Sequence, residues 1–157
     1  MQVKIKSVKA RLPLSKIKTK KMETTWKVDT MHSEVGFKVR HMMISNVSGS
    51  FGSFDAHATT AGDDFSTAQF SFNADIASIN TGVADRDGHL KSADFFDAEQ
   101  YPALTFSSTG VTQINDDTLE IAGTMQIKGQ SKPVVLKAEY AGIAVDPYGQ
   151  TKAGMTI

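Results

Sequence analysis

The feature that most constrains the fold of this chain is a two-residue alternation of apolar and polar side chains. In residues 34–40, Val35, Phe37 and Val39 fall on one face, and charged residues or glycine fall on the other. Residues 69–76 and 119–127 alternate in the same way. Period two buries one face of a β-strand and leaves the other face in water. The sequence therefore predicts an all-β protein built from antiparallel strands.

Turn signals divide the chain into a series of such segments. Gly, Asn, Asp or Pro occur at 61–64, 115–117, 128–130 and 146–149, between runs that favour strands. Successive strands joined by short turns either close into a barrel or pack as a sandwich, and closure removes exposed edges. The length of 157 residues suits one such domain.

Residues 78–102 interrupt this pattern. Charged residues dominate 83–92, and Leu90, Phe95 and Phe96 are the apolar anchors of the segment. A long strandless excursion in a small β domain usually forms a lid or a pocket wall. We predict a short helix within 83–96 that crosses one end of the barrel.

Charge separates a leader, residues 1–22, from the domain at 23–157. Residues 1–21 contain eight Lys/Arg and no acidic residue, whereas the remainder has nine Lys/Arg and all 17 Asp/Glu. An acidic domain does not favour nucleic acid as a partner. We interpret the leader as an extension upstream of a natural start at Met22. The alternatives are a disordered basic arm and a transit-like segment.

No part of the sequence predicts a membrane-spanning helix. The apolar stretches are much shorter than the roughly 18 residues that such a helix needs. Lys or Arg also interrupts the leader too often for a secretory signal. We therefore expect no transmembrane segment and a cytoplasmic location.

The sequence contains little that indicates catalysis or metal binding. It has no cysteine, and its four histidines lack the spacing of metal-binding motifs, so neither a metal nor a cofactor is predicted. Asp85, Asp87 and His89 form the densest polar cluster, together with Arg86. The cluster fits a structural network, a polar gate for a ligand head group, or a general acid–base site. Catalysis needs a converging nucleophile or metal, and none is visible, so we do not expect an enzyme.

The apolar faces of the predicted strands are rich in phenylalanine. A barrel of about eight strands is either filled by such side chains or hollow enough for one ligand. Composition does not decide between these two alternatives. The residues on the predicted inner faces are Val35, Phe37, Val39, Phe51, Phe54, Phe70, Phe72, Ile76, Leu104, Phe106, Ile121 and Met125.

Several separated blocks of the sequence resemble the YceI-like proteins. Residues 26–42 follow the pattern W-x-V-D-x-x-H-S-x-V-x-F-x-V-x-H-M, and residues 86–97 read RDGHLKSADFFD. Later blocks match in order and spacing, namely YPALTF at 101–106, GTMQIKG at 123–129, PV at 133–134, and DPYG at 146–149 before AG at 153–154. The resemblance covers residues 26–157.

This resemblance implies a lipocalin-like antiparallel β-barrel that binds a polyisoprenoid or isoprenoid-quinone-type lipid and has no enzymatic role. It also implies a homodimer as one oligomeric state. It marks Phe37, Phe72, Phe95, Phe96 and Phe106 as tunnel wall, and Arg86, Asp87 and His89 as a polar mouth. The predicted tunnel is completed by Val35, Val39, Phe54, Phe70, Ile76, Leu90, Leu104 and Met125.

Two departures from the family pattern carry expectations of their own. The basic leader stands where exported relatives have a signal peptide, so the periplasm is the alternative to a cytoplasmic location. The family pattern also continues past residue 154 with further strands, so we expect an incompletely closed barrel with exposed edges. Three hypotheses for function remain: a lipid carrier or sequestering protein, a filled-barrel structural or interaction domain, and an enzyme that uses Asp85, Asp87 and His89.

Overall fold

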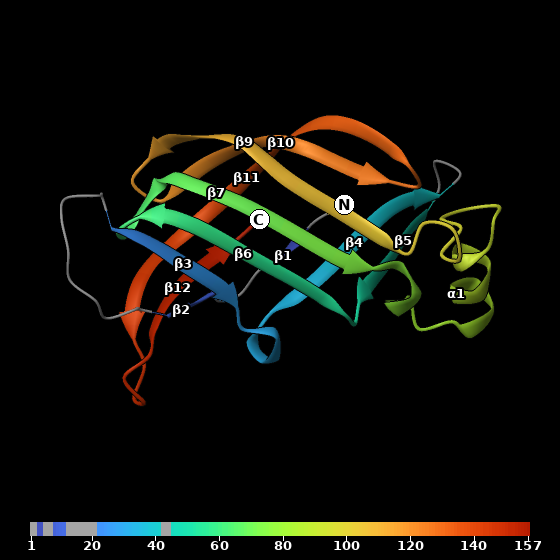
Figure 1. Ribbon diagram of the computed structural model, residues 1–157. Helices are drawn as coiled ribbons and strands as arrows, with labels where there is room; N and C mark the ends of the chain where they lie inside the picture. Colours follow the sequence, from blue (N-terminus) through green and yellow to red (C-terminus); the bar gives the residue numbers. More distant parts are fainter. Residues whose placement is uncertain (1–2, 5–7, 12–21, 42–44) are drawn as a thin grey trace.

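Two antiparallel β-sheets make up the fold (Figure 1). The structure, a computed structural model, describes residues 3–4, 8–11, 22–41 and 45–157. The barrel strands are β2 (Val8–Arg11), β3 (Glu23–Val28), β6 (Phe54–Ala61), β7 (Asp64–Asp75), β9 (Ala103–Asn115), β10 (Thr118–Ile127), β11 (Gln130–Val145) and β12 (Thr151–Thr156). They close in the order β10-β11-β12-β2-β3-β6-β7-β9. The predicted all-β class and antiparallel barrel are therefore confirmed.

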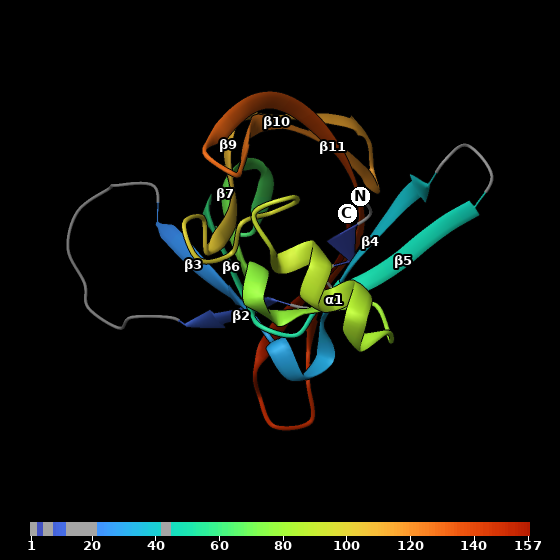
Figure 2. The same ribbon diagram turned by 90° about the vertical axis from the view of Figure 1, so that its right-hand side faces the viewer.

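A separate four-stranded sheet lies beside the barrel. Its strands are β1 (Val3–Lys4), β4 (Glu34–His41), β5 (Ser45–Phe51) and β8 (Ile79–Asn80), in the order β1-β4-β5-β8. Figure 2 shows the β4–β5 hairpin extending away from the barrel. Val35, Phe37 and Val39 were expected on the barrel wall, but they lie on β4 in this second sheet. Alternation defines which face of a strand is apolar, and it does not define which sheet the strand joins.

The seam between β12 and β3 is bridged, which corrects the expectation of an open barrel. β2 pairs with β3 from Val8↔Val28 to Arg11↔Thr25, and with β12 at Lys152↔Lys9 and Ala153↔Val8. A strand here satisfies backbone groups that two open edges would leave unpaired. An ion pair also crosses the seam, because Lys152 Nζ lies 3.4 Å from the buried carboxylate of Asp29, which follows β3.

Residues between β8 and β9 form a cap over one end of the molecule. Here the term cap denotes residues 81–102. Its helix, α1, runs from Ala84 to Lys91, and turns follow it. The expected short helix in this excursion is confirmed, although it ends before the expected limit at residue 96. Two short 3-10 helices, η1 (Thr30–His32) and η2 (Ile76–Ser78), complete the secondary structure. No helix in the described ranges is long and apolar enough to cross a membrane.

The barrel core is packed by pairing small residues with large ones. Ala58 pairs with both Trp26 and Phe70 on its two neighbouring strands, and Ala56 pairs with Phe72. Alternating small and large side chains fit the limited interior of a barrel of this size. Trp26 is fully buried, and its indole Nε1 donates a hydrogen bond to Thr60 Oγ1 at 2.8 Å. This donor is therefore satisfied inside the core.

Candidate functional site

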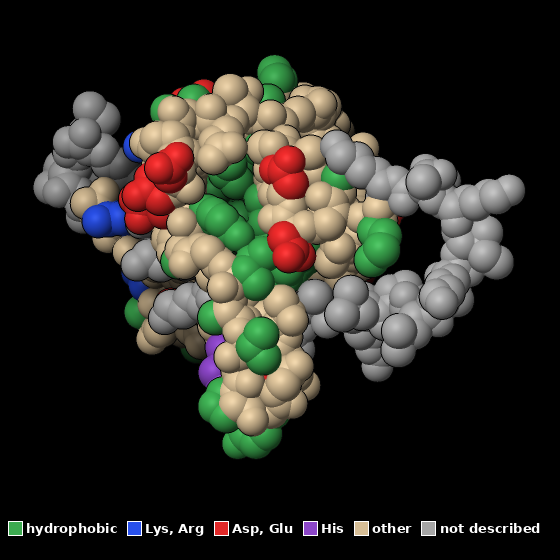
Figure 3. Space-filling model, turned by 90° about the vertical axis from the view of Figure 1, so that its left-hand side faces the viewer, with side chains coloured by type: hydrophobic (Ala, Val, Ile, Leu, Met, Phe, Trp, Pro, Cys, Tyr) green, Lys and Arg blue, Asp and Glu red, His purple; other side chains and the backbone are tan. Residues whose placement is uncertain are grey.

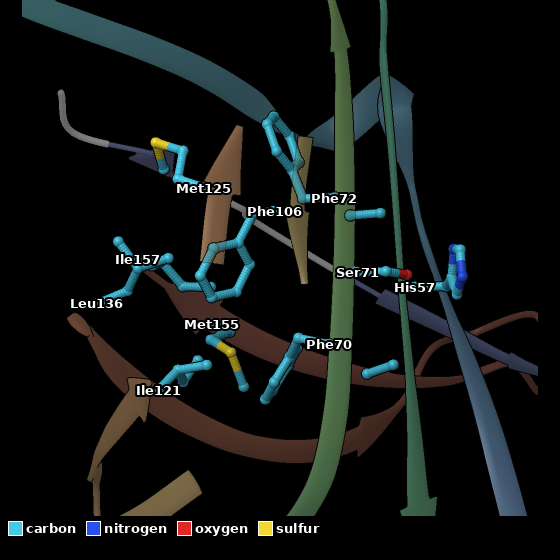
Figure 4. Close-up of a pocket in the computed structure, with 12 residues that line it drawn as sticks. His57, Phe70, Ser71, Phe72, Phe106, Ile121, Met125, Leu136, Met155 and Ile157 are labelled. Carbon is cyan, nitrogen blue, oxygen red and sulfur yellow. The ribbon is translucent and has the colours of Figure 1, made fainter. Parts of the chain in front are cut away.

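The barrel interior contains a small apolar cavity, which we call the inner cavity (Figure 4). Its volume is about 30 Å³, far below the roughly 300–1,000 Å³ that is typical of ligand pockets. Phe70, Phe72 and Phe106 point into it, whereas His57 and Ser71 point away. The other labelled side chains around it are Ile121, Met125, Leu136, Met155 and Ile157. Most of the barrel interior is thus filled by side chains.

A much larger cavity lies between the β4–β5 hairpin and the cap, and we call it the cap cavity. Its volume is about 530 Å³, which falls within the usual range for ligand pockets. Val39 and Phe95 leave about half of their surface exposed there, at 53% and 48%. The lining residues are Phe37, Val39, Val47, Asp85, Arg86, His89, Leu90, Phe95 and Phe96. Apolar side chains with a few polar groups at one side suit an amphiphilic ligand.

Glycine shapes the floor of the cap cavity. The ring of Phe37 lies against Gly49 on the paired strand β5, so a Cβ at position 49 would lie 2.5 Å from that ring and 2.9 Å from Asn80 O. Real Cβ atoms do not come this close to other atoms. The absence of a side chain at position 49 therefore leaves room for the ring of Phe37, which also packs against Phe51 with ring centroids 5.5 Å apart.

Thr81 anchors the start of the cap. Asp87 accepts hydrogen bonds from Thr81 N at 2.8 Å and Thr81 Oγ1 at 2.6 Å. Arg86 Nε donates to Thr81 Oγ1 at 2.8 Å, and its Nη2 donates to Thr81 O at 3.0 Å. The hydrogen bond from the Thr81 hydroxyl is the largest cause that lowers the pKa of Asp87 below 3.8. Arg86 and Asp87 thus form a local network around one threonine.

Further contacts hold the far side of the cap. His89 packs edge-on against Phe95 with ring centroids 4.7 Å apart, and its Nε2 lies 3.5 Å from Asp94 Oδ2. Lys128 Nζ, in the β10–β11 turn, donates to Ala93 O at 2.7 Å. The bond from Lys128 therefore ties the cap to the barrel, whereas the contacts of Thr81 and His89 lie within the cap.

The structure divides the predicted polar mouth. Arg86 and His89 line the cap cavity, as does Asp85, but Asp87 does not. Its carboxylate is bound to Thr81 instead. Successive residues on a helix point about 100° apart, so neighbouring Arg86 and Asp87 need not face the same space.

The residues that were predicted to line one apolar tunnel fall into three groups in the structure. Phe37, Val39, Leu90, Phe95 and Phe96 line the cap cavity. A second group, Phe70, Phe72, Phe106 and Met125, lines the inner cavity. Val35, Ile76 and Leu104 are core residues without a place in either lining, and Phe54 packs against the core. No residue lines both of these cavities among those described, so the single tunnel that the sequence predicted is replaced by two separate spaces.

A hollow lies at the end of the barrel opposite the cap (Figure 3). Figure 3 shows hydrophobic side chains within a hollow at this end, with acidic side chains around it. The β6–β7 turn with Asp63 and Asp64 lies here, as does the β9–β10 turn with Asp116 and Asp117, because β7 and β9 pair antiparallel. Among the described residues, this mouth therefore carries a group of carboxylates, a feature that the strand pattern did not reveal.

The catalytic hypothesis gains no geometric support. Asp87 is bound to Thr81, and His89 is close to exposed Asp94. In the described part of the chain, no group of three or more His, Cys, Asp or Glu side chains could hold a metal ion. The described residues instead form an antiparallel barrel with a small apolar cavity inside it and a larger cavity beneath the cap.

The chain belongs to the YceI-like family, whose domain matches residues 26–157. It is 37% identical over 123 residues to a UPF0312 protein of Vibrio cholerae. This aligned region covers 78% of this chain and 65% of the relative. It is 36% identical over 131 residues to protein YceI of Escherichia coli. Here the aligned region covers 82% of this chain and 68% of that protein. The chain thus spans about two thirds of the length of these relatives.

Solved structures of related proteins share the fold. The Campylobacter jejuni YceI protein is 38% identical, with a TM-score of 0.65, over 82% of this chain and 75% of that one. BcnA of Burkholderia cenocepacia has a TM-score of 0.67 at 20% identity, over 82% of this chain and 98% of that one. A polyisoprenoid binding domain from Saccharophagus degradans has a TM-score of 0.50 at 11% identity, over 98% of this chain and 96% of that domain. The last two show likeness of fold alone.

The hydrogen bonds at Thr81 give the cap an expected pH dependence. A carboxylate whose pKa is lowered by folding stabilises the folded state above its ordinary value of 3.8, and this contribution is lost as pH falls through the lowered pKa. Amide protection in α1, measured by hydrogen exchange, should therefore fall in acid. Asp87→Asn should reduce protection already at pH 7 and remove this acid dependence. Exposed Glu99→Gln, in the same cap, is the control, and an Asp87→Asn profile like that of wild type would contradict the expectation.

Proposed function

We propose that the protein binds a long apolar amphiphile, of the polyisoprenoid or isoprenoid-quinone type, and carries or sequesters it without catalysis. The observation that carries this proposal is the cap cavity of about 530 Å³, with its apolar lining and its polar groups at α1. Burying ligand surface against such a lining contributes on the order of 25 cal/mol per Å². Family membership supports the proposal, and so does the neighbour of the same fold that is described as a polyisoprenoid binding domain.

The inner cavity would accept a ligand only after its side chains rearrange. Met125 and Met155 line it, and methionine is unbranched and adapts readily to a changed space. A lipid chain too long for the cap cavity would have to open the inner cavity. The volume of about 30 Å³ also favours a second candidate function, a filled-barrel structural domain. That candidate requires the folded protein to gain no stability from added lipid.

A charge placed inside the cap cavity tests the proposed function. Leu90→Asp puts a carboxylate among Phe37, Phe95 and Phe96, where it has to be desolvated when a lipid enters. We expect affinity for geranylgeraniol, measured by calorimetric titration, to fall about tenfold or more, which corresponds to 1.4 kcal/mol. Val135→Asp is the matched control, because Val135 is 65% exposed on the outer face of β11.

The outcomes separate the two candidate functions. Binding by wild type and the control, with loss in Leu90→Asp, supports an amphiphile in the cap cavity. If wild type shows neither heat of binding nor a raised melting temperature with geranylgeraniol, the filled-barrel candidate replaces the proposal. Circular dichroism establishes that both variants retain the β fold.

A further inference from the structure

A third space opens at the β10–β11 hairpin, and we call it the hairpin groove. Its volume is about 260 Å³, and it is lined by Met125, Ile127, Gln130, Lys132 and Val134. Met125 lines the inner cavity as well, so its side chain borders both the barrel interior and the groove. None of the predicted polar-mouth residues takes part in it.

The strand register places a cation at the end of an apolar row. Lys132 pairs with Met125, and Gln130 pairs with Ile127. Directly opposed residues of an antiparallel pair share one face of the sheet, and residues two apart on a strand do so too. Lys132 therefore continues the inward row that begins at Leu136, which lines the inner cavity, and passes through Val134.

Exposure increases along this row toward the hairpin. Ala138 is fully buried, Leu136 and Val134 are partly buried, and Lys132 and Gln130 are exposed. A lysine in this position can lay its apolar stem along the row and keep its ammonium group at the water boundary. Such a row is apolar at its inner end and offers hydrogen-bond donors at its outer end.

The described residues at the two ends of the barrel carry different charges. Among the described residues that line the hairpin groove, Lys132 is charged and none is acidic. The opposite mouth carries the carboxylates of Asp63 and Asp64 and those of the β9–β10 turn. Burial raises the pKa of Tyr140 near that mouth, and the charge of Asp63 raises it further. Lys132 therefore favours an anionic group at the hairpin groove, whereas the carboxylates described at the opposite mouth disfavour one.

Arg86 is a weaker candidate for an anion. Its Nε and Nη2 already donate to Thr81, and Asp85 lines the same cavity. The hairpin groove has no such competing carboxylate among its described lining residues. Charge complementarity thus selects Lys132 rather than the polar residues of α1.

We propose that Lys132 and Gln130 form a head-group subsite for an amphiphile with an anionic head, a carboxylate or a phosphate ester, whose chain lies along Met125 and Val134. This inference rests on the proposed function, because it needs the protein to bind amphiphiles. The hairpin groove shares no described lining residue with the cap cavity, so it adds a second place for an amphiphile and the chemical class of the head group held there. The lysine supplies charge and donors, and the glutamine amide supplies a further donor. The apolar row holds the adjoining part of the chain.

Three lipids with one chain and different heads test the subsite. Oleic acid, oleyl phosphate and oleyl alcohol are titrated separately into wild type, Lys132→Met and Lys137→Met. Lys137 is the matched control, because it lies on the same strand but is exposed on the opposite face. Methionine keeps an unbranched apolar stem and removes the charge.

We expect wild type and Lys137→Met to prefer the acid or the phosphate over the alcohol by about tenfold. Lys132→Met should lose that preference and retain its affinity for the alcohol, and added salt should weaken the wild-type preference. The acid and phosphate arms show which head is bound more tightly. A preference that survives in Lys132→Met, or alcohol binding without any preference in wild type, overturns the subsite and leaves the proposed function intact. Failure of all three lipids to bind overturns the subsite, and the titration with geranylgeraniol decides the proposed function separately.

Discussion

Replacing Trp26 by alanine should lower the free energy of unfolding by about 3–5 kcal/mol, the usual cost of removing a large aromatic side chain from a core. Trp26 is fully buried, and it packs against Phe65 with ring centroids 4.9 Å apart. The substitution also removes the indole donor from Thr60 Oγ1. Small domains are stable by only about 5–15 kcal/mol, so this loss removes a large fraction of the total stability.

Urea denaturation followed by circular dichroism measures the effect of Trp26→Ala, since the chain has one tryptophan and fluorescence would be lost. Trp26→Phe should cost less, because it retains a ring in the core. Lys27→Ala, at an exposed position on the same strand, should change stability by less than about 0.5 kcal/mol. If the free energy of unfolding of Trp26→Ala were within about 1 kcal/mol of the wild-type value, this result would contradict the described core, because core truncations of this kind cost more.

Gly123→Ala should destabilise the barrel by about 1–3 kcal/mol, as overpacking of a close-packed core does. A Cβ at position 123 would lie 2.5 Å from Ser107 O, and it would overlap the ring of Phe106 still more closely. The Phe106 ring could rotate, but the carbonyl belongs to the backbone of the paired strand β9. Relief therefore requires β9 and β10 to move apart, and this movement would also disturb the inner cavity that Phe106 lines.

Gly110→Ala provides the matched control. Gly110 lies on β9, it is paired with Ala122, and an added Cβ there would meet nothing within 4 Å. Removing a glycine where space allows stabilises by about 0.4–1 kcal/mol, through the unfolded state. In thermal and urea denaturation, the free energy of unfolding should therefore fall for Gly123→Ala and rise for Gly110→Ala. Equal changes in stability for the two variants would show that Gly123 does not lie as close to Phe106 as described.

Local alternation predicted the strands because each strand must bury one face. The row of Leu119, Ile121, Gly123, Met125 and Ile127 was expected on one face of a strand, and β10 buries its first three residues and half-buries the last two. β7 is longer than its alternating segment, beginning at Asp64 rather than at residue 69. Its first residues, such as Phe65, pack against Trp26 across the barrel end, which period two does not reveal.

Tertiary placement could not be predicted from the same signal. The alternation of Val35, Phe37 and Val39 is as regular as that of the barrel strands, yet β4 pairs with β5 in the second sheet. Which sheet a strand joins depends on partners distant in sequence. The closure of the barrel by β2 likewise depends on pairing between residues 8–11 and both β3 and β12.

The sequence predicted several residues of the candidate site, but it did not predict how the structure arranges them. Leu90, Phe95 and Phe96 were expected to be anchors of the excursion, and they line the cap cavity with Phe37. Lys132 was missed, because it follows a turn and precedes Pro133, and no pattern of apolar residues includes it. Its inward position follows only from the register with Met125.

Photocrosslinking tests most directly the claim that an apolar amphiphile occupies the cap cavity. An isoprenoid alcohol that carries a diazirine is bound to the folded protein and irradiated, and the labelled peptides are identified by mass spectrometry. An amphiphile in the cap cavity should place labels on residues 83–96 and on β4, and unlabelled geranylgeraniol should compete them away. Labels confined to the exposed outer face of β11 around Val135, or labels that geranylgeraniol does not displace, would contradict it.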